Sequence, residues 1–153
     1  AQGAGVWNAL IFHYFSTKRD LYLELVQRAC GELVKATYVG EMQKPPLERL
    51  HAGLVRYLDF VEKHQRGYIT LLSSGVGVDR EVFGVIENVR RTLAERILRA
   101  MPGENPHAEV AIRGIIGFVE AASVAWLEKK TMTRDELVIL TVRMLVTALG
   151  LNR

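Results

Sequence analysis

Apolar residues recur every three to four positions along most of the chain, which is the spacing of one face of an α-helix. No segment shows the sustained alternation of apolar and polar residues that indicates a half-buried strand. Glycine, proline and cap residues divide the pattern into successive helices. We predict helices at about residues 18–41, 46–64, 68–73, 80–101, 106–130 and 134–149, after a short apolar-aromatic segment at 8–15 that periodicity alone leaves open between helix and strand. The expected fold class is all-α, with about seven helices joined by short turns.

Cap residues support several of these boundaries. Thr17 stands three residues before Asp20, and Thr133 stands three residues before Glu136. Both arrangements are capping boxes, in which the hydroxyl accepts a hydrogen bond from a backbone amide and the carboxylate binds back to the cap residue. Asn105, which precedes a proline, is expected to be the N-cap of the helix that follows it.

The last two predicted helices carry more apolar surface than a small monomer readily buries. Small residues form a stripe along one face of the penultimate helix, and small side chains let another helix approach closely. The final helix is apolar nearly all round between Leu137 and Val146, as expected of a helix buried on every side. We therefore expect a homodimer that pairs through the last two helices, the alternative being that both helices fill the core of a monomer. The stripe consists of Gly114, Gly117, Ala121 and Ala125.

The composition is that of an ordinary soluble protein, with 49% hydrophobic and 24% charged residues. The net charge of +3 permits an anionic partner without requiring one, since the charges are spread along the chain. Cys30 is the only cysteine, so the sequence holds no disulfide framework. The most apolar segments, 110–127 and 137–149, are interrupted by charged residues and do not favour a membrane span. These features, and the absence of a signal peptide at the start, predict a cytoplasmic protein.

No arrangement of reactive residues predicts catalysis or a metal site. The histidines have no H-x-x-x-H or H-E-x-x-H spacing, and Gly75 and Gly77 indicate a turn, because no strand precedes them and no lysine follows. We therefore expect neither an enzyme nor a cofactor. Arginines between residues 87 and 99 interleave with glutamates, which we interpret as a solvated helix face. These arginines are Arg90, Arg91, Arg96 and Arg99.

The segment at residues 4–22 resembles the second half of the helix-turn-helix of the TetR family of transcriptional regulators. In that family a glycine makes the tight turn between two helices, a short recognition helix ends in a His-Tyr-Phe run, and a lysine opens the next helix. Gly5, the run at 13–15 and Lys18 occupy these positions. Weaker similarity to the sensor domains of the family continues in two segments, 67–87 and 117–128.

The resemblance implies that residues 1–22 are the C-terminal part of a DNA-binding domain and that residues 23–153 form a ligand-binding and dimerisation domain. Residues near the start of the recognition helix would contact base edges in the major groove of double-stranded operator DNA. Residues at its other end, and the lysine in the first turn of the next helix, would contact phosphates. The implied DNA-binding residues are Asn8, Ala9, His13, Tyr14, Thr17 and Lys18.

Two features depart from the family pattern. Trp7 stands where the family usually has serine or threonine as the N-cap of the recognition helix, and an indole does not accept the capping hydrogen bond. The chain begins without a methionine, and the first helix and most of the second helix of the DNA-binding domain are absent. Those helices support the recognition helix, so we expect DNA binding from the full-length parent rather than from this chain.

The resemblance also implies a small-molecule pocket among the middle helices, between the DNA-binding domain and the dimer helices. Aromatic residues on the corresponding helices are the candidates to line it. Such a lining predicts a largely apolar ligand, with tyrosine hydroxyls or Arg113 fixing its polar end. The candidates are Tyr57, Phe60, Tyr68, Phe83, Phe118 and Trp126.

Together these features predict a homodimeric regulator, a repressor that a small-molecule ligand releases from a palindromic operator. The alternative from another class is a helical dimerisation or protein-interaction module without DNA binding, whose apolar last helices contact a protein partner. Monomeric behaviour, or a dimer formed only with another chain, would favour that alternative. A helical-bundle enzyme would need converging titratable groups, which the sequence does not indicate.

Overall fold

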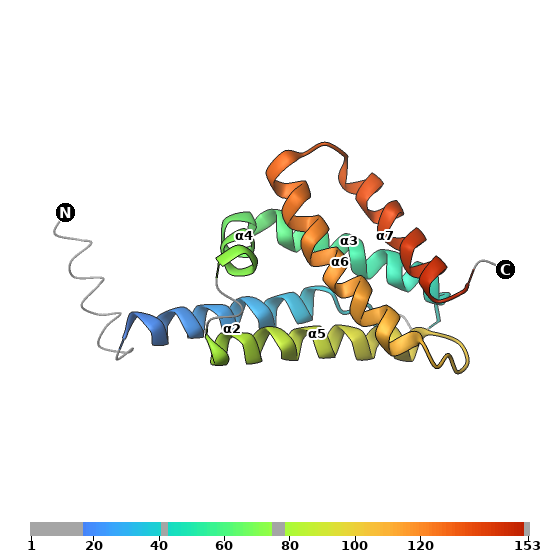
Figure 1. The fold of residues 1–153 in the computed structure, drawn as a ribbon, viewed down its shortest axis with the longest axis horizontal. Helices are drawn as coiled ribbons and strands as arrows, with labels where there is room; N and C mark the ends of the chain where they lie inside the picture. The colour runs from blue at the N-terminus through green and yellow to red at the C-terminus, as the bar shows by residue number, and fades with distance from the viewer. Residues whose placement is uncertain (1–16, 41–42, 75–78, 152–153) are drawn as a thin grey trace.

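The structure is a computed structural model that describes residues 17–40, 43–74 and 79–151. Within these residues it contains six helices and no strand, so the predicted all-α fold is confirmed. The apolar-aromatic segment at 8–15 lies outside the described residues. The helices in Figure 1 are α2 (Lys18–Ala36), α3 (Pro46–Lys63), α4 (Gln65–Ser74), α5 (Arg80–Ala100), α6 (Ala108–Lys129) and α7 (Arg134–Ala148).

Two long helices, α2 and α5, lie side by side and run in the same direction along one side of the molecule (Figure 1). α6 packs on α5, and α7 packs on both α3 and α6. α3 contacts each of the other described helices, and the short helix α4 contacts α3 and α6. α3 therefore lies at the centre of the bundle, and α5 packs directly on α6 beside it.

Polar contacts fix α2 against α5 at both ends. Near their first residues, the Arg19 guanidinium binds the carboxylates of Asp79 at 2.9 Å and Glu81 at 3.2 Å. Near their last residues, Arg96 donates a hydrogen bond of 2.8 Å to the carbonyl oxygen of Val34. Asp79 is also the N-cap of α5, because its carboxylate accepts hydrogen bonds from two amides of the first turn. The start of α2 is thereby held to the start of α5.

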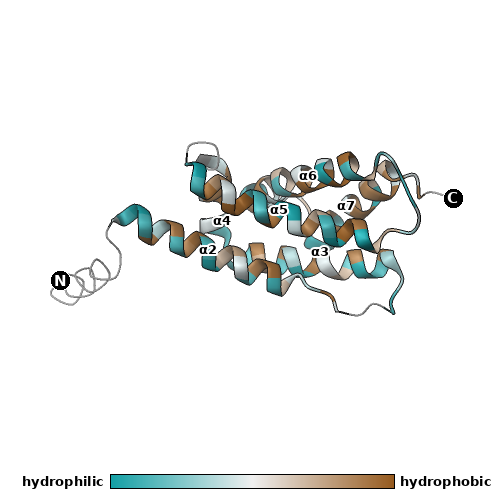
Figure 2. Ribbon diagram, turned by 90° about the horizontal axis from the view of Figure 1, so that it is seen from below, coloured by the Kyte–Doolittle hydropathy of each residue, from teal (hydrophilic) through white to brown (hydrophobic). Residues whose placement is uncertain are grey.

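The buried apolar residues form two clusters. The larger one gathers residues of α2, α3, α5, α6 and α7, and includes Leu58, Val61 and Val82, which are at most 1% exposed. The smaller one lies between α6 and α7 and includes Ile112 and Leu145. Burying one such side chain contributes about 1.5–3 kcal/mol relative to leaving it exposed. The apolar stripes of the helices thus face inward, and polar and apolar residues alternate around α2 and α5 (Figure 2).

The predicted end of the first long helix is wrong by several residues. α2 ends at Ala36 rather than near residue 41. The Thr37 hydroxyl donates to the carbonyl oxygen of Leu33 at 2.8 Å, and Arg96 binds the next carbonyl oxygen, that of Val34. The Leu33 carbonyl already accepts the last helical hydrogen bond, from the Thr37 amide, whereas Arg96 takes the Val34 carbonyl that a further turn would use, so the helix stops there.

The predicted starts of two other helices also need correction. α6 begins at Ala108, and His107 rather than Asn105 is its N-cap residue. The Asn105 side chain instead accepts a hydrogen bond from the His107 amide at 2.9 Å and donates one to the carbonyl oxygen of Leu149 at 3.2 Å. The second bond ties the start of α6 to the end of α7. α4 begins at Gln65, earlier than the predicted residue 68.

Other predicted caps are present. At α7, the Thr133 hydroxyl accepts from the Glu136 amide at 3.2 Å, and the Glu136 carboxylate accepts from the Thr133 amide at 2.7 Å, which confirms this capping box. At α2, the Thr17 hydroxyl accepts from the Asp20 amide at 3.0 Å. After α7, Gly150 has a φ of 68°, in the left-handed region that favours glycine at the end of a helix.

Among the described helices, α6 alone has the length and composition of a helix that could cross a membrane. Core helices of soluble proteins share both properties, and 33% of its apolar window is buried inside this molecule. Two of its charged residues, Arg113 and Glu120, form ion pairs with α5. In this structure α6 is a packed helix of the bundle.

Candidate functional site

A large cavity runs through the middle of the helix bundle. Its volume is about 1120 Å³, slightly above the usual range for small-molecule pockets. All six described helices contribute to its lining, which is mostly apolar. Lining residues extend from Arg49 to Lys63 on α3 and from Ile86 to Ala100 on α5. At about 1.5 Å per residue each stretch is roughly 21 Å long, so the cavity is elongated along these helices.

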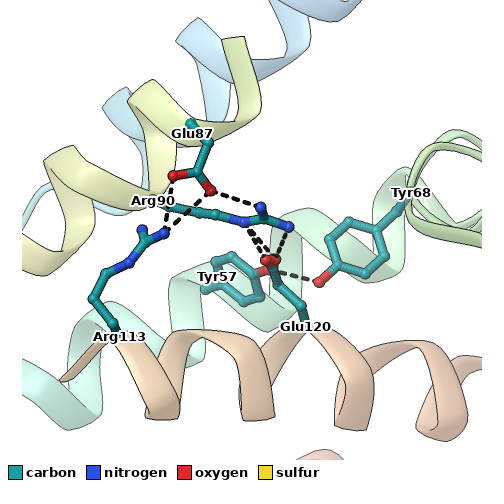
Figure 3. A network of polar contacts seen from close by, with 6 residues as sticks. All are labelled: Tyr57, Tyr68, Glu87, Arg90, Arg113 and Glu120. Carbon is teal, nitrogen blue, oxygen red and sulfur yellow. Dashed lines mark hydrogen bonds and ion pairs between the residues drawn. The ribbon is translucent and has the colours of Figure 1, made fainter. Parts of the chain in front are cut away.

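A chain of charged side chains crosses the cavity wall between α5 and α6 (Figure 3). Arg90 Nε lies 2.7 Å from Glu120 Oε1, and Arg90 Nη2 lies 3.0 Å from Glu120 Oε2. Arg90 also donates to Glu87 at 2.8 Å, and Arg113 donates to the same carboxylate at 2.9 Å. Two arginines thus face two glutamates, and their formal charges cancel.

The pKa shifts in this chain follow from its hydrogen bonds. The hydrogen bond to Glu120 is the main cause that raises the pKa of Arg90. The hydrogen bond from Arg90 is the main cause that lowers the pKa of Glu87. Both groups are therefore held in their charged forms at neutral pH. The Arg90 and Glu120 side chains are 22% and 13% exposed, so their pairing takes place largely away from solvent.

Two tyrosines from neighbouring helices meet beside these charges (Figure 3). The hydroxyl oxygens of Tyr57 on α3 and Tyr68 on α4 lie 2.6 Å apart, and either one is able to donate. Their rings meet edge to face, with centroids 6.2 Å apart. Burial raises the pKa of both phenols. At neutral pH the pair is therefore uncharged and retains its hydroxyl protons.

The six aromatic residues predicted to line a pocket divide into two groups. Tyr57, Phe60 and Tyr68 line the cavity. Phe83 is 46% exposed at the start of α5, and Phe118 and Trp126 on α6 are likewise absent from the cavity lining. The prediction that these three residues line the pocket is therefore wrong for this cavity.

Trp126 has a structural role at the connection between α6 and α7. It is 5% exposed, and its Nε1 donates to the carbonyl oxygen of Met132 at 2.9 Å. The Lys130 ammonium lies 3.9 Å from the centroid of its ring. These contacts fix the turn between the two helices.

The sequence interpretation of the α5 arginines as a solvated face is wrong for Arg90 and Arg96, which both line the cavity. A signal for Arg90 was present in the spacing, because it lies four residues after Ile86, on the buried side of α5. Glu120 was also missed, although it lies four residues after the buried Ile116. Arg113, predicted to fix a ligand's polar end, pairs with Glu87 and does not line the cavity.

α2 connects the cavity with the segment that resembles a recognition helix. Its side chains Tyr22, Leu25, Val26 and Leu33 line the cavity. Its first residue is Lys18, which is exposed, and Thr17 is its N-cap. The other predicted DNA-binding residues, Asn8, Ala9, His13 and Tyr14, lie outside the described residues. The predicted domain division after residue 22 falls within α2 and stays a prediction.

The stripe of small residues on α6 faces outward. Gly114, Gly117, Ala121 and Ala125 are all exposed. Apart from its sequence neighbours and its own helix backbone, nothing lies within 4 Å of the position that a Cβ would take at either glycine. Val110, on the same helix, is 78% exposed. On α7, three large apolar side chains are 39–48% exposed, so neither of the last two helices is fully covered within one chain. They are Ile139, Leu140 and Met144.

Comparisons with known proteins agree with the family resemblance in the sequence. Residues 46–148 match the family model of the tetracyclin repressor-like C-terminal domain, which is more than half of the chain. The chain is also similar to the crystal structure of a TetR-family transcriptional regulator from Streptomyces coelicolor, with 28% sequence identity and a TM-score of 0.87. That match covers 99% of this chain and 69% of the other. TetR-family regulators are generally non-enzymatic transcription factors. This chain belongs to the TetR family of transcriptional regulators.

Proposed function

We propose that the protein is a homodimeric repressor that binds palindromic operator DNA in the cytoplasm and is released when a small molecule enters the cavity. The observation that carries this proposal is the position of α2. It contributes Tyr22, Leu25 and Val26 to the cavity lining, and it begins directly after the segment that resembles a recognition helix. A ligand that moves α2 therefore moves the DNA-reading segment attached to it.

The contacts at the start of α2 supply a route for this movement. Arg19 joins α2 to Asp79, the N-cap of α5, and α5 lines the cavity along much of its length. A ligand that shifts α5 or α2 thus changes the direction in which α2 leaves the bundle. The ligand must bind the released conformation more tightly than the DNA-bound one, because equal affinity for both states shifts neither population.

The exposed faces of α6 and α7 support the homodimer. An exposed apolar surface of this kind is typical of an interface. The small side chains of the α6 stripe let the same helix of a second copy approach closely, and a two-fold axis brings identical faces together. Pairing of the two copies would place the two DNA-reading segments on one side of the dimer, as a palindromic operator requires.

DNA contacts are proposed for the residues that match the family's recognition segment. Asn8 and Ala9 would contact base edges, and His13 and Tyr14 would contact phosphates. Lys18 lies exposed in the first turn of α2, where the amides and dipole of a helix N-terminus already favour an anion. Thr17 would contribute mainly by capping α2.

Operator binding tests the proposal most directly. The protein expressed from its complete coding sequence is titrated with DNA from upstream of its own gene and with random DNA of equal length, at several salt concentrations. Lys18→Ala is compared with Lys35→Ala, which removes an exposed lysine from the other end of α2. We expect Lys18→Ala to weaken binding and to reduce the salt slope by about 1, because one phosphate contact is lost.

Lys35→Ala should bind DNA as the unaltered protein does. The proposal would be contradicted if the unaltered protein bound neither the DNA upstream of its own gene nor any other genomic fragment more tightly than random DNA. A dimer that forms without any specific DNA affinity would instead support a protein-interaction module.

A further inference from the structure

The two charged side chains that face each other across the cavity wall, Arg90 and Glu120, are already paired. Arg90 holds both oxygens of Glu120 and one oxygen of Glu87, and Arg113 holds Glu87. A carboxylate or ammonium group placed beside Arg90 would have to compete with these partners. Separating Arg90 from Glu120 would leave a buried charge without a counter-ion, which is strongly unfavourable. The interior therefore offers no vacant place for a charged group.

The Tyr57–Tyr68 pair differs from the charged chain because it keeps hydrogen-bonding capacity. Two phenols carry two hydroxyl protons, and their mutual hydrogen bond uses one of them. The second proton and the remaining lone pairs are able to serve a neutral partner. Ser123, which is fully buried on α6, adds a third uncharged hydroxyl beside Tyr68. Burial keeps both tyrosines protonated, so the pair has no charge to offer an ionic group.

Among the other cations that line the cavity, Arg49 and Arg96 are engaged by other groups, and the rest are exposed to water. Arg96 donates to the carbonyl oxygen of Val34 and to the Thr37 hydroxyl, and it lies 5.3 Å from the centroid of the Tyr38 ring. Lys63, Arg66 and Arg99 are exposed. Exposed charges are hydrated and screened by salt, so they contribute little to the selection of a ligand. The buried groups in the interior decide which ligand fits.

We propose that the cavity takes an uncharged, elongated and largely apolar molecule whose hydroxyl or carbonyl oxygen hydrogen-bonds to the Tyr57–Tyr68 pair. This inference rests on the proposed ligand-responsive function and names the chemical class of its ligand. The apolar lining along α3 and α5 holds the body of the molecule, and the tyrosine pair orients its polar end. A neutral oxygen leaves the Arg90–Glu120 pair undisturbed.

Probes that differ only in their polar group test this assignment. Decan-1-ol, 2-decanone, decanoate and decylammonium have ten-carbon skeletons and are compared at pH 7 by isothermal titration calorimetry with the protein. We expect the alcohol and the ketone to bind at least about tenfold more tightly than either ion, a difference of about 1.4 kcal/mol. Their affinity should not depend on salt, because no charge is neutralised.

A pair of matched variants locates the hydrogen bond. Tyr57→Phe combined with Tyr68→Phe removes both hydroxyls and little else, and we expect it to weaken binding of decan-1-ol about tenfold. Thr92→Val removes a hydroxyl of α5 that lies outside the cavity lining and donates to the carbonyl oxygen of Asn88 at 2.9 Å, and it should leave that affinity unchanged. Circular dichroism and a urea midpoint establish that each variant is folded.

Several results would overturn the inference. If decanoate bound as tightly as decan-1-ol, and if Arg96→Gln or Arg99→Gln abolished that binding, the cavity would be assigned to an anionic ligand. Equally tight binding of decylammonium, unchanged affinity in the doubly substituted tyrosine variant, or no binding of any probe would also overturn it. Operator binding by the probe-free protein is measured separately. Its absence would contradict the proposed repressor without altering the ranking of the probes.

Discussion

Replacing Glu120 by alanine tests whether the charged chain in the cavity wall stabilises the fold through a buried ion pair. Glu120 accepts three hydrogen bonds from Arg90, at 2.7, 3.0 and 3.1 Å, and links α6 to α5. The variant keeps Arg90 in place but removes its main counter-ion. The guanidinium then stays beside the cavity with Glu87 as its remaining partner.

The magnitude follows from the exposure of the pair. Breaking a fully buried ion pair by removing one partner costs about 3–5 kcal/mol. Here Arg90 is 22% exposed and retains Glu87, so part of that cost is relieved. We expect the free energy of unfolding to fall by about 2–3 kcal/mol. At about 2–4 °C per kcal/mol for a chain of this size, the Tm should fall by about 4–12 °C.

Urea unfolding at a fixed protein concentration measures this loss, because the stability of the proposed dimer would depend on concentration. Glu62→Ala is the matched control, since Glu62 also joins two helices through a cation, Lys130, at 2.8 Å. Those side chains are 43% and 44% exposed. A surface pair of this kind contributes about 0–1 kcal/mol. Glu120→Ala should therefore cost clearly more than Glu62→Ala.

Equal losses in the two variants would refute the reasoning that burial makes the Arg90–Glu120 pair important. The double substitution Arg90→Met with Glu120→Leu provides a second test. It removes both charges and fills their space with apolar groups, so most of the lost stability should return. A double variant as unstable as Glu120→Ala would show that an unpaired charge is not the cause.

Three further predictions use other parts of the structure. Burial raises the pKa of Tyr57 and Tyr68, so the unfolded chain loses these protons at a lower pH than the folded chain does. The free energy of unfolding should therefore fall as pH rises above about 10. The variant with both tyrosines replaced by phenylalanine should show a smaller fall in its urea midpoint. Because the pKa of Glu87 is lowered, the stability that it contributes is present above about pH 4.3 and is lost at lower pH. In Glu87→Gln the free energy of unfolding should therefore fall less steeply as the pH is lowered, and an unchanged fall would contradict this assignment. Ala121→Arg places a charge in the proposed dimer face and should raise the dimer Kd by more than about a hundredfold in analytical ultracentrifugation, whereas Ala36→Arg, at the exposed end of α2, should not.

Much of the fold could be predicted from the sequence because its determinants act within one or two helical turns. The Thr133 hydroxyl and the Glu136 carboxylate cap α7 across three residues, and Gly150 ends it through its own backbone freedom. The apolar spacing of α3 was likewise enough to place it between Pro46 and Lys63. Family membership was visible in the short segment up to Lys18. Such features need no knowledge of what the helix packs against.

Errors at helix ends arose where distant residues take part. α2 stops at Ala36 partly because Arg96, on another helix, binds the carbonyl oxygen of Val34. Asn105 is not the N-cap residue of α6, and its side chain donates to the carbonyl oxygen of Leu149, at the end of α7. The sequence pattern around each residue is the same whether or not that distant partner is present. Periodicity therefore predicts that a helix exists more securely than it predicts where the helix ends.

By itself, the sequence determined the helices, most of their caps and the family to which the chain belongs. Only the tertiary structure decided which side chains meet in the cavity. Arg90 and Glu120 are 30 residues apart, and each is of a charged type that usually lies at the surface. They become partly buried partners only when α5 and α6 pack together. Tyr57 and Phe83 are both aromatic residues on helices, yet one faces the cavity and the other faces solvent. The physical reason is that the rotation of each helix is set by all of its packing partners at once, and this information is not contained in any single segment.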